Sequence, residues 1–214
     1  MFNKRHIVRT IAATVSILAL SFTAACGSGQ STASNSTDSD DITQQTYKPG
    51  KLTIATGQPA YEPWVMNDKP ESGEGYEAAV AYAVADKLGF KKSDVVWTRT
   101  AFDTAIAPGA KDWDFNIQQF GITDERKKAV DFSSSYYNDS QSVVVKKDSK
   151  FANATKVSDL KDATVGVMVG TLAYDYAKAN IKDDIQTFND DAALAQALDA
   201  GQIDALVTST VECV

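Results

Sequence analysis

The run Thr164-Val165-Gly166-Val167-Met168-Val169, followed by Gly170-Thr171, has the pattern of a buried strand that leads into a helix. The residues from Thr171 to Asn180 are expected to form this helix, and the next strand is expected over Ile185 to Phe188. A strand, a helix and a second strand in this order are typical of a parallel sheet.

The same alternation continues on both sides of this run. Downstream, Asp190 is expected to cap a helix that carries Leu194 and Leu198 and ends at Gly201, and a final strand is expected over Ile203 to Val207. Upstream, the expected elements are a strand over Leu52 to Thr56, a helix from Glu74-Gly75 to Gly89, a strand over Val95 to Thr98, a short helix over Phe102 to Ile106, a strand over Phe115 to Gln119 and an extended connection from Gln141 to Lys147. Two successive runs of this kind predict two α/β lobes, each a mostly parallel sheet flanked by helices. We expect lobe 1 over residues 51–140, a hinge strand and lobe 2 over 141–214, and a ligand cleft between the lobes.

The amino terminus has the features of an export signal. Three basic residues precede an uncharged apolar segment from Ile11 to Phe22, which is shorter than the ~20 residues of a membrane-spanning helix. Small residues at Thr23-Ala24-Ala25 then suit a signal peptidase, so we predict a signal peptide over 1–25; a short uncleaved anchor is the alternative. Cys26 before Gly27-Ser28-Gly29 resembles a lipobox, with Thr23 in place of the usual leucine, and implies lipidation at Cys26.

The composition narrows the chemistry of the exported chain. Residues 27–50 are polar and are expected to form a flexible linker, so that the region 26–50 joins a lipid anchor to the folded lobes. Cleavage after residue 25 removes three of the 21 Lys and Arg and none of the 28 Asp and Glu, which leaves a net charge of −10 and argues against nucleic acid as a partner. His6 lies in the signal, and an acylated Cys26 leaves Cys213 as the sole thiol, available for a bond to another chain. Histidine-based nucleophiles and histidine zinc sites are therefore excluded, and we expect no metal and no cofactor, while pairs of catalytic carboxylates remain open.

One arginine stands out as a candidate anion-binding group. Arg126 closes the segment Ile122-Thr123-Asp124-Glu125-Arg126, just past an expected strand, and Asp131-Phe132-Ser133 follows it. A guanidinium can bind a carboxylate through two parallel hydrogen bonds. The alternative is a surface ion pair between Arg126 and Asp124 or Asp131.

These motifs, together with Gly75-Tyr76-Glu77 at a helix start and Val165-Gly166-Val167 before Gly170-Thr171, resemble the family-3 solute-binding proteins. These proteins are receptors that deliver amino acids to bacterial ABC importers. The resemblance implies a two-lobed, type II periplasmic-binding-protein-like fold from about residue 51 onward. It also implies that the ligand carboxylate meets Arg126, with help from backbone amides near Thr123 and at the helix start.

The resemblance also implies which residues contact the rest of the ligand. Tyr61, Phe102 and Trp64 match positions of aromatic packing against the ligand, although each also suits a hydrophobic core. Gln118 and Gln119 offer donors and acceptors for a polar amino acid, and strand alternation predicts that one of them faces the cleft.

The chain departs from the family pattern at several ligand positions. Gln118, Gln119 and Gly121 stand just ahead of the Ile-Thr segment, where many members have small hydroxyl residues. Ser209 stands where an aspartate usually pairs with the ligand ammonium, and Leu172 stands where a second hydroxyl is common. Glu62 or Glu77 could replace the aspartate, although Glu77 is expected to serve the helix start. Related chains continue beyond this point, so we expect the part that completes both lobes to be missing, either by truncation or because it comes from elsewhere.

The sequence therefore predicts a monomeric lipoprotein on the outer face of the cell membrane that binds an amino acid and works with ABC permease subunits. Closure of the two lobes about a hinge would report the bound ligand. A secreted enzyme on the same scaffold, such as a carboxylate-based dehydratase, is one alternative. A sensor or a ligand-free fragment is the other.

Overall fold

The computed structural model describes residues 41–213, with side chains up to residue 211. The predicted signal peptide and Cys26 lie outside the described residues, and the thiol of Cys213 lies outside the described side chains. No helix in the described range is long and apolar enough to cross a membrane.

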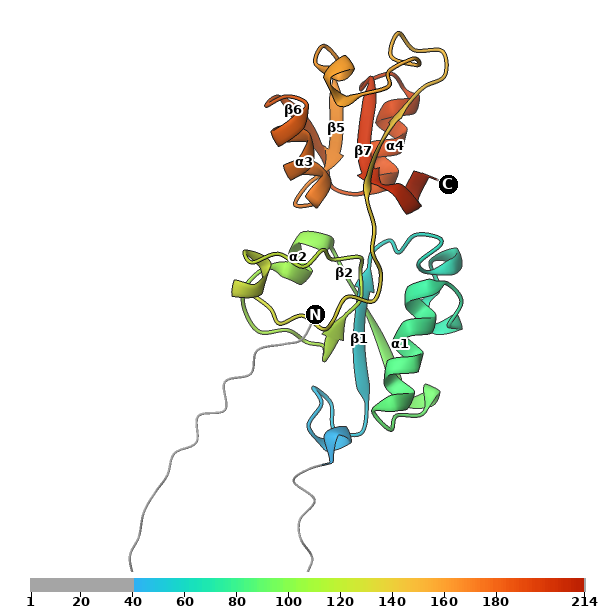
Figure 1. Cartoon of the computed structure of the whole chain (residues 1–214). Helices are drawn as coiled ribbons and strands as arrows, with labels where there is room; N and C mark the ends of the chain where they lie inside the picture. Colours follow the sequence, from blue (N-terminus) through green and yellow to red (C-terminus); the bar gives the residue numbers. More distant parts are fainter. Residues whose placement is uncertain (1–40, 214) are drawn as a thin grey trace, which may run out of the picture.

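Lobe 1 is built on a three-stranded parallel sheet in the order β2-β1-β3 (Figure 1). Its elements are β1 (Leu52–Gly57), α1 (Tyr76–Lys87), β2 (Val95–Thr100), α2 (Phe102–Ile106) and β3 (Phe115–Asn116). α1 covers one face of the sheet, where Leu52 and Ile54 pack against Ala81 and Ala85. On the other face, Ala55 packs with Ala105 of α2 and with Trp113 and Val130. This alternation along β1 buries the strand on both sides and fixes its register.

Lobe 2 is built on a four-stranded sheet in the order β4-β7-β5-β6, in which only β4 among the described strands is antiparallel. Its elements are β4 (Gln141–Val145), β5 (Val165–Met168), α3 (Leu172–Asn180), β6 (Ile185–Phe188), α4 (Asp191–Asp199) and β7 (Ala205–Ser209). Val143 and Val145 face the core under α3, and Val144 faces the core under α4. The two helices therefore cover opposite faces of the sheet, as the predicted α/β pattern requires.

Short 3₁₀ turns join these elements. They span Ile42–Gln44, Met66–Asp68, Pro70–Ser72, Lys92–Asp94, Arg126–Lys128, Val157–Leu160 and Thr210–Cys213.

Local signals set where the helices begin. Thr171 and Asp190 cap α3 and α4 by accepting hydrogen bonds from Tyr174 N (3.4 Å) and Ala193 N (2.8 Å). α1 begins instead after Gly75, which has a φ of +101° and lies where an added Cβ would be 2.5 Å from the carbonyl oxygen of Trp64. Glycine is therefore required at this start.

Three expectations about the elements need correction. The strand expected over Phe115 to Gln119 ends at Asn116, because the chain turns at Gln119 into the left-handed region with a φ of +52°. The last strand runs over Ala205–Ser209 rather than 203–207, and it pairs with β4, which forms where the hinge strand was expected. Residues 41–50 were expected to belong to the flexible linker. They instead form a 3₁₀ turn capped by Asp41, and Thr46 in them is buried.

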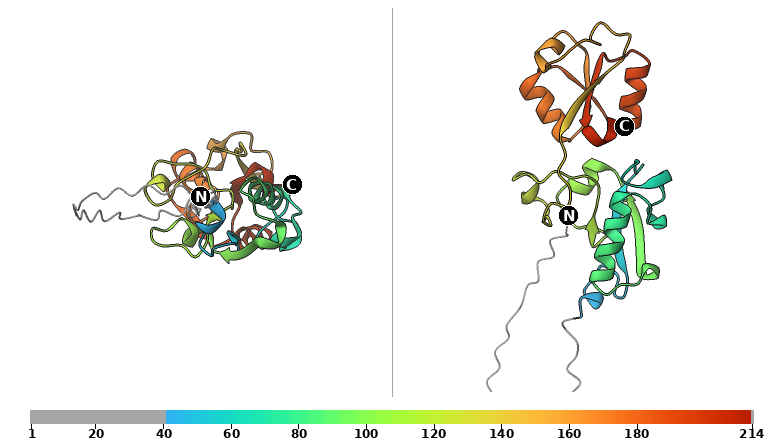
Figure 2. Two further views of the ribbon diagram at one scale, coloured as in Figure 1. Left: turned by 90° about the horizontal axis from the view of Figure 1, so that it is seen from below. Right: turned by 45° about the vertical axis from the view of Figure 1, so that its right-hand side comes forward.

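The two sheets point the carboxyl ends of their parallel strands toward each other. β1 rises toward lobe 2 with β3 parallel to it, β5 and β7 descend toward lobe 1, and the connection between residues 131 and 141 passes from lobe 1 to lobe 2 (Figures 1 and 2). Ligands of open α/β sheets bind at this edge. A ligand site is therefore expected between the lobes.

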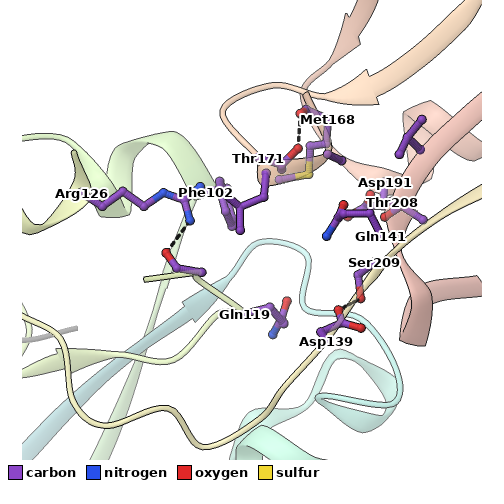
Figure 3. Close-up of a pocket in the computed structure, with 14 residues that line it drawn as sticks. Phe102, Gln119, Arg126, Asp139, Gln141, Met168, Thr171, Asp191, Thr208 and Ser209 are labelled. Carbon is purple, nitrogen blue, oxygen red and sulfur yellow. Dashed lines mark hydrogen bonds between the residues drawn. The ribbon is translucent and has the colours of Figure 1, made fainter. Parts of the chain in front are cut away.

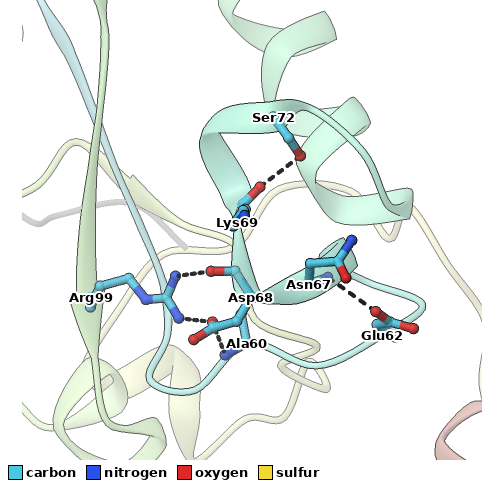
Figure 4. A network of polar contacts seen from close by, with 7 residues as sticks. All are labelled: Ala60, Glu62, Asn67, Asp68, Lys69, Ser72 and Arg99. Carbon is cyan, nitrogen blue, oxygen red and sulfur yellow. Dashed lines mark hydrogen bonds and ion pairs between the residues drawn. The ribbon is translucent and has the colours of Figure 1, made fainter.

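The loop after β1 is held against lobe 1 by one aspartate (Figure 4). Asp68 accepts a hydrogen bond from Ala60 N at 2.9 Å and forms an ion pair with Arg99 of β2, which also donates to the Asp68 carbonyl at 3.3 Å. Asn67 N donates to the Glu62 carboxylate at 3.0 Å. These contacts hold the loop that places Tyr61 at the cleft. They also bond the Glu62 carboxylate to the backbone of the same loop, away from the cleft.

Candidate functional site

A cavity of about 150 Å³ lies between the lobes, at the carboxyl ends of β5 and β7 (Figure 3). It is lined by Phe102, Gln119, Gly121, Arg126, Asp139, Gln141, Met168, Thr171, Leu172, Ala173, Asp191, Val207, Thr208 and Ser209. The charged side chains among these are one arginine and two aspartates, so the cavity presents charges of both signs.

A second cavity of about 160 Å³ adjoins the first and shares Phe102, Gln119, Met168 and Asp191 with it. Its further lining comes from the loop after β1 and from the residues before α4: Thr56, Gly57, Gln58, Pro59, Ala60, Tyr61, Ala101, Gln118, Asn189 and Asp190. The shared residues make the two cavities one continuous cleft.

Arg126 is buried at the edge of the first cavity, with 9% of its surface exposed. Its guanidinium donates to the carbonyl of Gly121 at 2.8 Å and, across the cleft, to the carbonyl of Gly170 at 2.8 Å. The rings of Phe102 and Phe120 lie 5.7 and 5.5 Å from it, within cation–π range. Burial lowers the pKa of Arg126 from its ordinary value, while the charge of Asp175 opposes this shift.

The surface ion pair considered as an alternative role for Arg126 is not formed. Asp124 instead accepts from Lys127 at 3.0 Å, and no carboxylate among the described side chains forms an ion pair with Arg126. A buried cation that bonds only neutral carbonyls is a favourable place for an anion.

The other residues predicted for the carboxylate subsite shape its backbone. Thr123 Oγ1 accepts from Arg126 N at 3.2 Å and so holds the turn that carries the guanidinium. Gly170, with a φ of +74°, turns its carbonyl toward Arg126, and Thr171 lines the cavity while its hydroxyl donates to Met168 O at 2.8 Å. Thr123 of lobe 1 and Gly170 of lobe 2 thus accept hydrogen bonds from Arg126, and Thr171 lines the same cavity.

The three predicted aromatic residues occupy different places. Phe102 lines both cavities and stacks on Phe120, with ring centroids 4.1 Å apart. Tyr61 lines the second cavity, and its hydroxyl lies 3.5 Å from Asp190 of lobe 2 and accepts from Ala192 N at 3.2 Å. Burial raises the pKa of Tyr61 to about 12. Trp64 is 3% exposed and lines neither of these two cavities, but it lines a third cavity of about 80 Å³ that shares Gln119 and Asp139 with the first.

The two glutamines also differ. Gln118 is buried, accepts from Asn116 Nδ2 at 3.2 Å and lines the second cavity. Gln119 lines both cavities, yet its backbone and side-chain amides donate to Glu77. The expected strand alternation does not apply, because neither residue lies in β3.

Glu77 is fully buried and does not lie in the cleft. Its carboxylate accepts from Gln119 N at 2.8 Å, from the Gln119 side chain and from the Tyr136 hydroxyl. Burial raises the pKa of Glu77 to about 7, although these hydrogen bonds oppose the shift. The carboxylate therefore supports the cleft wall from behind rather than replacing the missing ligand aspartate.

The structure adds cleft residues that the sequence did not identify, mainly Asp139, Gln141, Met168, Asp191 and Thr208. Burial, with Asp190 as a second cause, raises the pKa of Asp191 to about 6, while a hydrogen bond from Thr208 lowers it. Met168 and Thr208 lie at strand ends, so the rule that parallel sheets bind ligands at their carboxyl edge could have found them. Asp139 lies in the connection, where no local pattern marks it. Among the described residues, no group of three metal-binding side chains occurs.

Comparisons with known proteins place the chain in a family. Residues 52–185 match the bacterial extracellular solute-binding proteins, family 3. The chain is 33% identical over 149 residues to the L-cystine-binding protein TcyJ of Escherichia coli K12. This alignment covers 69% of this chain and 54% of that protein. It is 32% identical over 225 residues to the glutamine-binding protein of Geobacillus stearothermophilus. This alignment covers 96% of this chain and 82% of the relative.

A solved structure agrees with these matches. The ancestral amino acid-binding protein AncCDT-1, a precursor of cyclohexadienyl dehydratase, superposes with a TM-score of 0.61 and 34% identity over 75% of this chain and 71% of that one. The chain spans about half the length of TcyJ, 54%. The predicted two-lobed α/β fold is confirmed by these likenesses. The chain belongs to family 3 of the bacterial extracellular solute-binding proteins.

Proposed function

We propose that this chain is the extracytoplasmic substrate-binding component of an ABC importer and that it binds a polar amino acid in the cleft between its lobes. The observation that carries the proposal is Arg126, a buried cation on the cavity wall that bonds two carbonyl oxygens and forms no ion pair with a carboxylate among the described side chains. An amino acid carboxylate would supply the missing charge through charge-assisted hydrogen bonds. The relatives named for glutamine and L-cystine binding support the same ligand class.

The geometry supports a particular order of contacts. The ligand carboxylate would lie between Arg126 and the amino terminus of α3 at Thr171, where backbone N–H groups favour an anion. The ligand side chain would extend past Phe102 toward Tyr61 and Gln118 in the second cavity. Because these groups come from both lobes, binding would favour the closed arrangement that a transporter can recognise.

A thermal-melt panel tests the proposal. Each of the common amino acids is added to the purified protein, and a ligand at about 100 times its dissociation constant should add ~2.7 kcal/mol to the free energy of unfolding. That gain should raise the melting midpoint by several degrees. Arg126→Ala should remove the shift, whereas Lys127→Ala, which changes an exposed neighbouring cation, should keep it. A selective shift that survives Arg126→Ala would contradict the assignment of the carboxylate subsite.

Export, anchoring and partners belong to the same proposal. A signal peptide over 1–25 would carry the chain across the membrane, and acylation of Cys26 would tether a monomer to its outer face, near the permease subunits. Cys26→Ala should then release the protein from the membrane fraction of expressing cells. A variant that stays in that fraction would contradict the lipid anchor.

An enzyme on the same scaffold is the second candidate. Asp191 lines the cleft with a pKa raised to about 6, which suits a proton donor or acceptor near neutral pH. Conversion of prephenate or a similar acid that Asp191→Asn abolishes would favour this candidate. Ligand binding without turnover favours the importer component.

A further inference from the structure

Two residues from different segments form a fixed pair on the side of the cavity away from Arg126 (Figure 3). The hydroxyl of Ser209 donates to one carboxylate oxygen of Asp139, and Ser140 N donates to the other at 2.8 Å. Both side chains line the same cavity as Arg126. A cation and a carboxylate thus line one cavity from opposite sides, and Asp139 is exposed to solvent there.

The sheet register explains why these residues meet. Antiparallel pairing of β4 with β7 places Gln141 opposite Ser209, so the connection that precedes β4 runs beside the end of β7. Thr210 N donates to Ser140 O at 2.8 Å, and the hydroxyls of Ser140 and Thr210 lie 2.8 Å apart. The pairing therefore holds Asp139 at the carboxyl edge of the lobe 2 sheet, although it belongs to no strand.

We propose that Asp139 binds the α-ammonium group of the amino acid ligand, and that Ser209 is a positioning residue that aims the Asp139 carboxylate. This inference rests on the proposed function. An α-amino acid carries a carboxylate and an ammonium on one carbon atom, so a site that binds it needs a cation and a carboxylate around one cavity. Arg126 and Asp139 are such a pair.

The chemistry of the pair fits this role. A carboxylate has two acceptor oxygens, each with more than one acceptor direction, so Asp139 can accept from an ammonium while it keeps its bonds to Ser209 and Ser140. A serine hydroxyl alone cannot neutralise an ammonium taken out of water. The family resemblance places a carboxylate at position 209. In this chain Ser209 stands there and donates a hydrogen bond to the carboxylate of Asp139.

Asp191 is the competing carboxylate of the same cavity. It lies in the first turn of α4 and is paired with Thr208, farther along the cleft toward Tyr61 and Asp190. We therefore assign Asp191 to the region of the ligand side chain. The test distinguishes the two aspartates directly.

The experiment compares amino acids with analogues that lack only the ammonium group. Calorimetric titrations use L-glutamine with glutaramate and L-arginine with 5-guanidinopentanoate, and they extend to other amino acids if neither binds. Asp139→Asn should lower affinity for the amino acid by roughly 10- to 100-fold, because a hydrogen bond to a charged group is lost. It should leave affinity for the analogue unchanged within about twofold, which also reports that the cleft is intact. Asp124→Asn, an exposed change near Arg126, serves as the matched control.

A charge-relocation variant separates binding from a structural role. The double change Asp139→Asn with Ser209→Asp places the carboxylate at position 209 instead of position 139, where the two side chains are hydrogen-bonded neighbours. This variant should recover part of the lost preference for the amino acid over its analogue. An equal loss for both compounds in Asp139→Asn, or a loss of that preference in Asp191→Asn instead, would overturn the proposal. Absence of any amino acid binding by the unchanged protein would contradict the proposed function itself, and with it this inference.

Discussion

Replacing Glu77 with glutamine should remove a pH dependence of stability that the structure assigns to this one side chain. Glu77 is 0% exposed, and its carboxylate is held by the Gln119 amides and the Tyr136 hydroxyl. Burial raises its pKa from 4.5 to about 7. The folded protein therefore keeps the Glu77 proton over a pH range in which the unfolded chain releases it.

The sign and size follow from proton linkage. Because the folded-state pKa is the higher one, the contribution of Glu77 to stability is fully present below pH 4.5 and is lost as the pH rises through about 7. A shift of this size corresponds to about 3 kcal/mol, at about 1.4 kcal/mol for each pKa unit. Glutamine at position 77 has no proton to release in this range, so the Glu77→Gln protein should lack this loss.

Urea unfolding measured at pH 4.5 and at pH 8 tests the prediction. The decrease in unfolding free energy between the two values should be about 3 kcal/mol larger in the unchanged protein than in Glu77→Gln. Asp191, whose pKa is also raised, contributes in both proteins and cancels in the comparison. Glu74→Gln removes an exposed carboxylate nearby and should preserve the full pH dependence. Equal decreases in the Glu77→Gln and unchanged proteins would refute the reasoning.

Three further changes have defined outcomes. Gly75→Ala should lower the free energy of unfolding by well over 1 kcal/mol in urea melts, because its Cβ would lie 2.5 Å from a backbone carbonyl oxygen. Gly89→Ala is the control: nothing lies within 4 Å of its Cβ, so it should cost only the ~1 kcal/mol of a positive φ. Equal costs for the two changes would contradict the steric argument. Leu194→Ala should cost ~2–5 kcal/mol, since this side chain is 1% exposed in the core under α4, and a loss below about 1 kcal/mol would contradict that packing. Tyr61→Phe removes the hydroxyl that bonds Ala192 N near Asp190 and should shift X-ray scattering in solution toward a more open form; an unchanged profile would show that this contact does not favour closure.

The elements that the sequence predicted well carry their signals locally. The β5–α3 unit follows from the valine-rich run and from the helix expected to start at Thr171, which the structure shows to be its capping residue. α4 follows in the same way from Asp190. Such caps and periodic patterns involve residues a few positions apart, which a single sequence displays directly.

The features of the site that sequence reasoning did not predict depend on distant partners. Gln119 leaves the strand because Glu77, 42 positions earlier, binds its amides. Asp139 reaches the cavity because β4 pairs with β7, and its partner Ser209 lies 70 positions away. An aromatic residue such as Trp64 gives the same signal in a core as in a cleft, so its buried position needed the three-dimensional structure.

A crystal structure with the amino acid that gives the largest thermal shift would test the central claim most directly. The account predicts that the ligand carboxylate lies within hydrogen-bonding distance of the Arg126 guanidinium, next to the start of α3, with its side chain against Phe102. A ligand bound elsewhere, with Arg126 still bonded only to the carbonyls of Gly121 and Gly170, would contradict it.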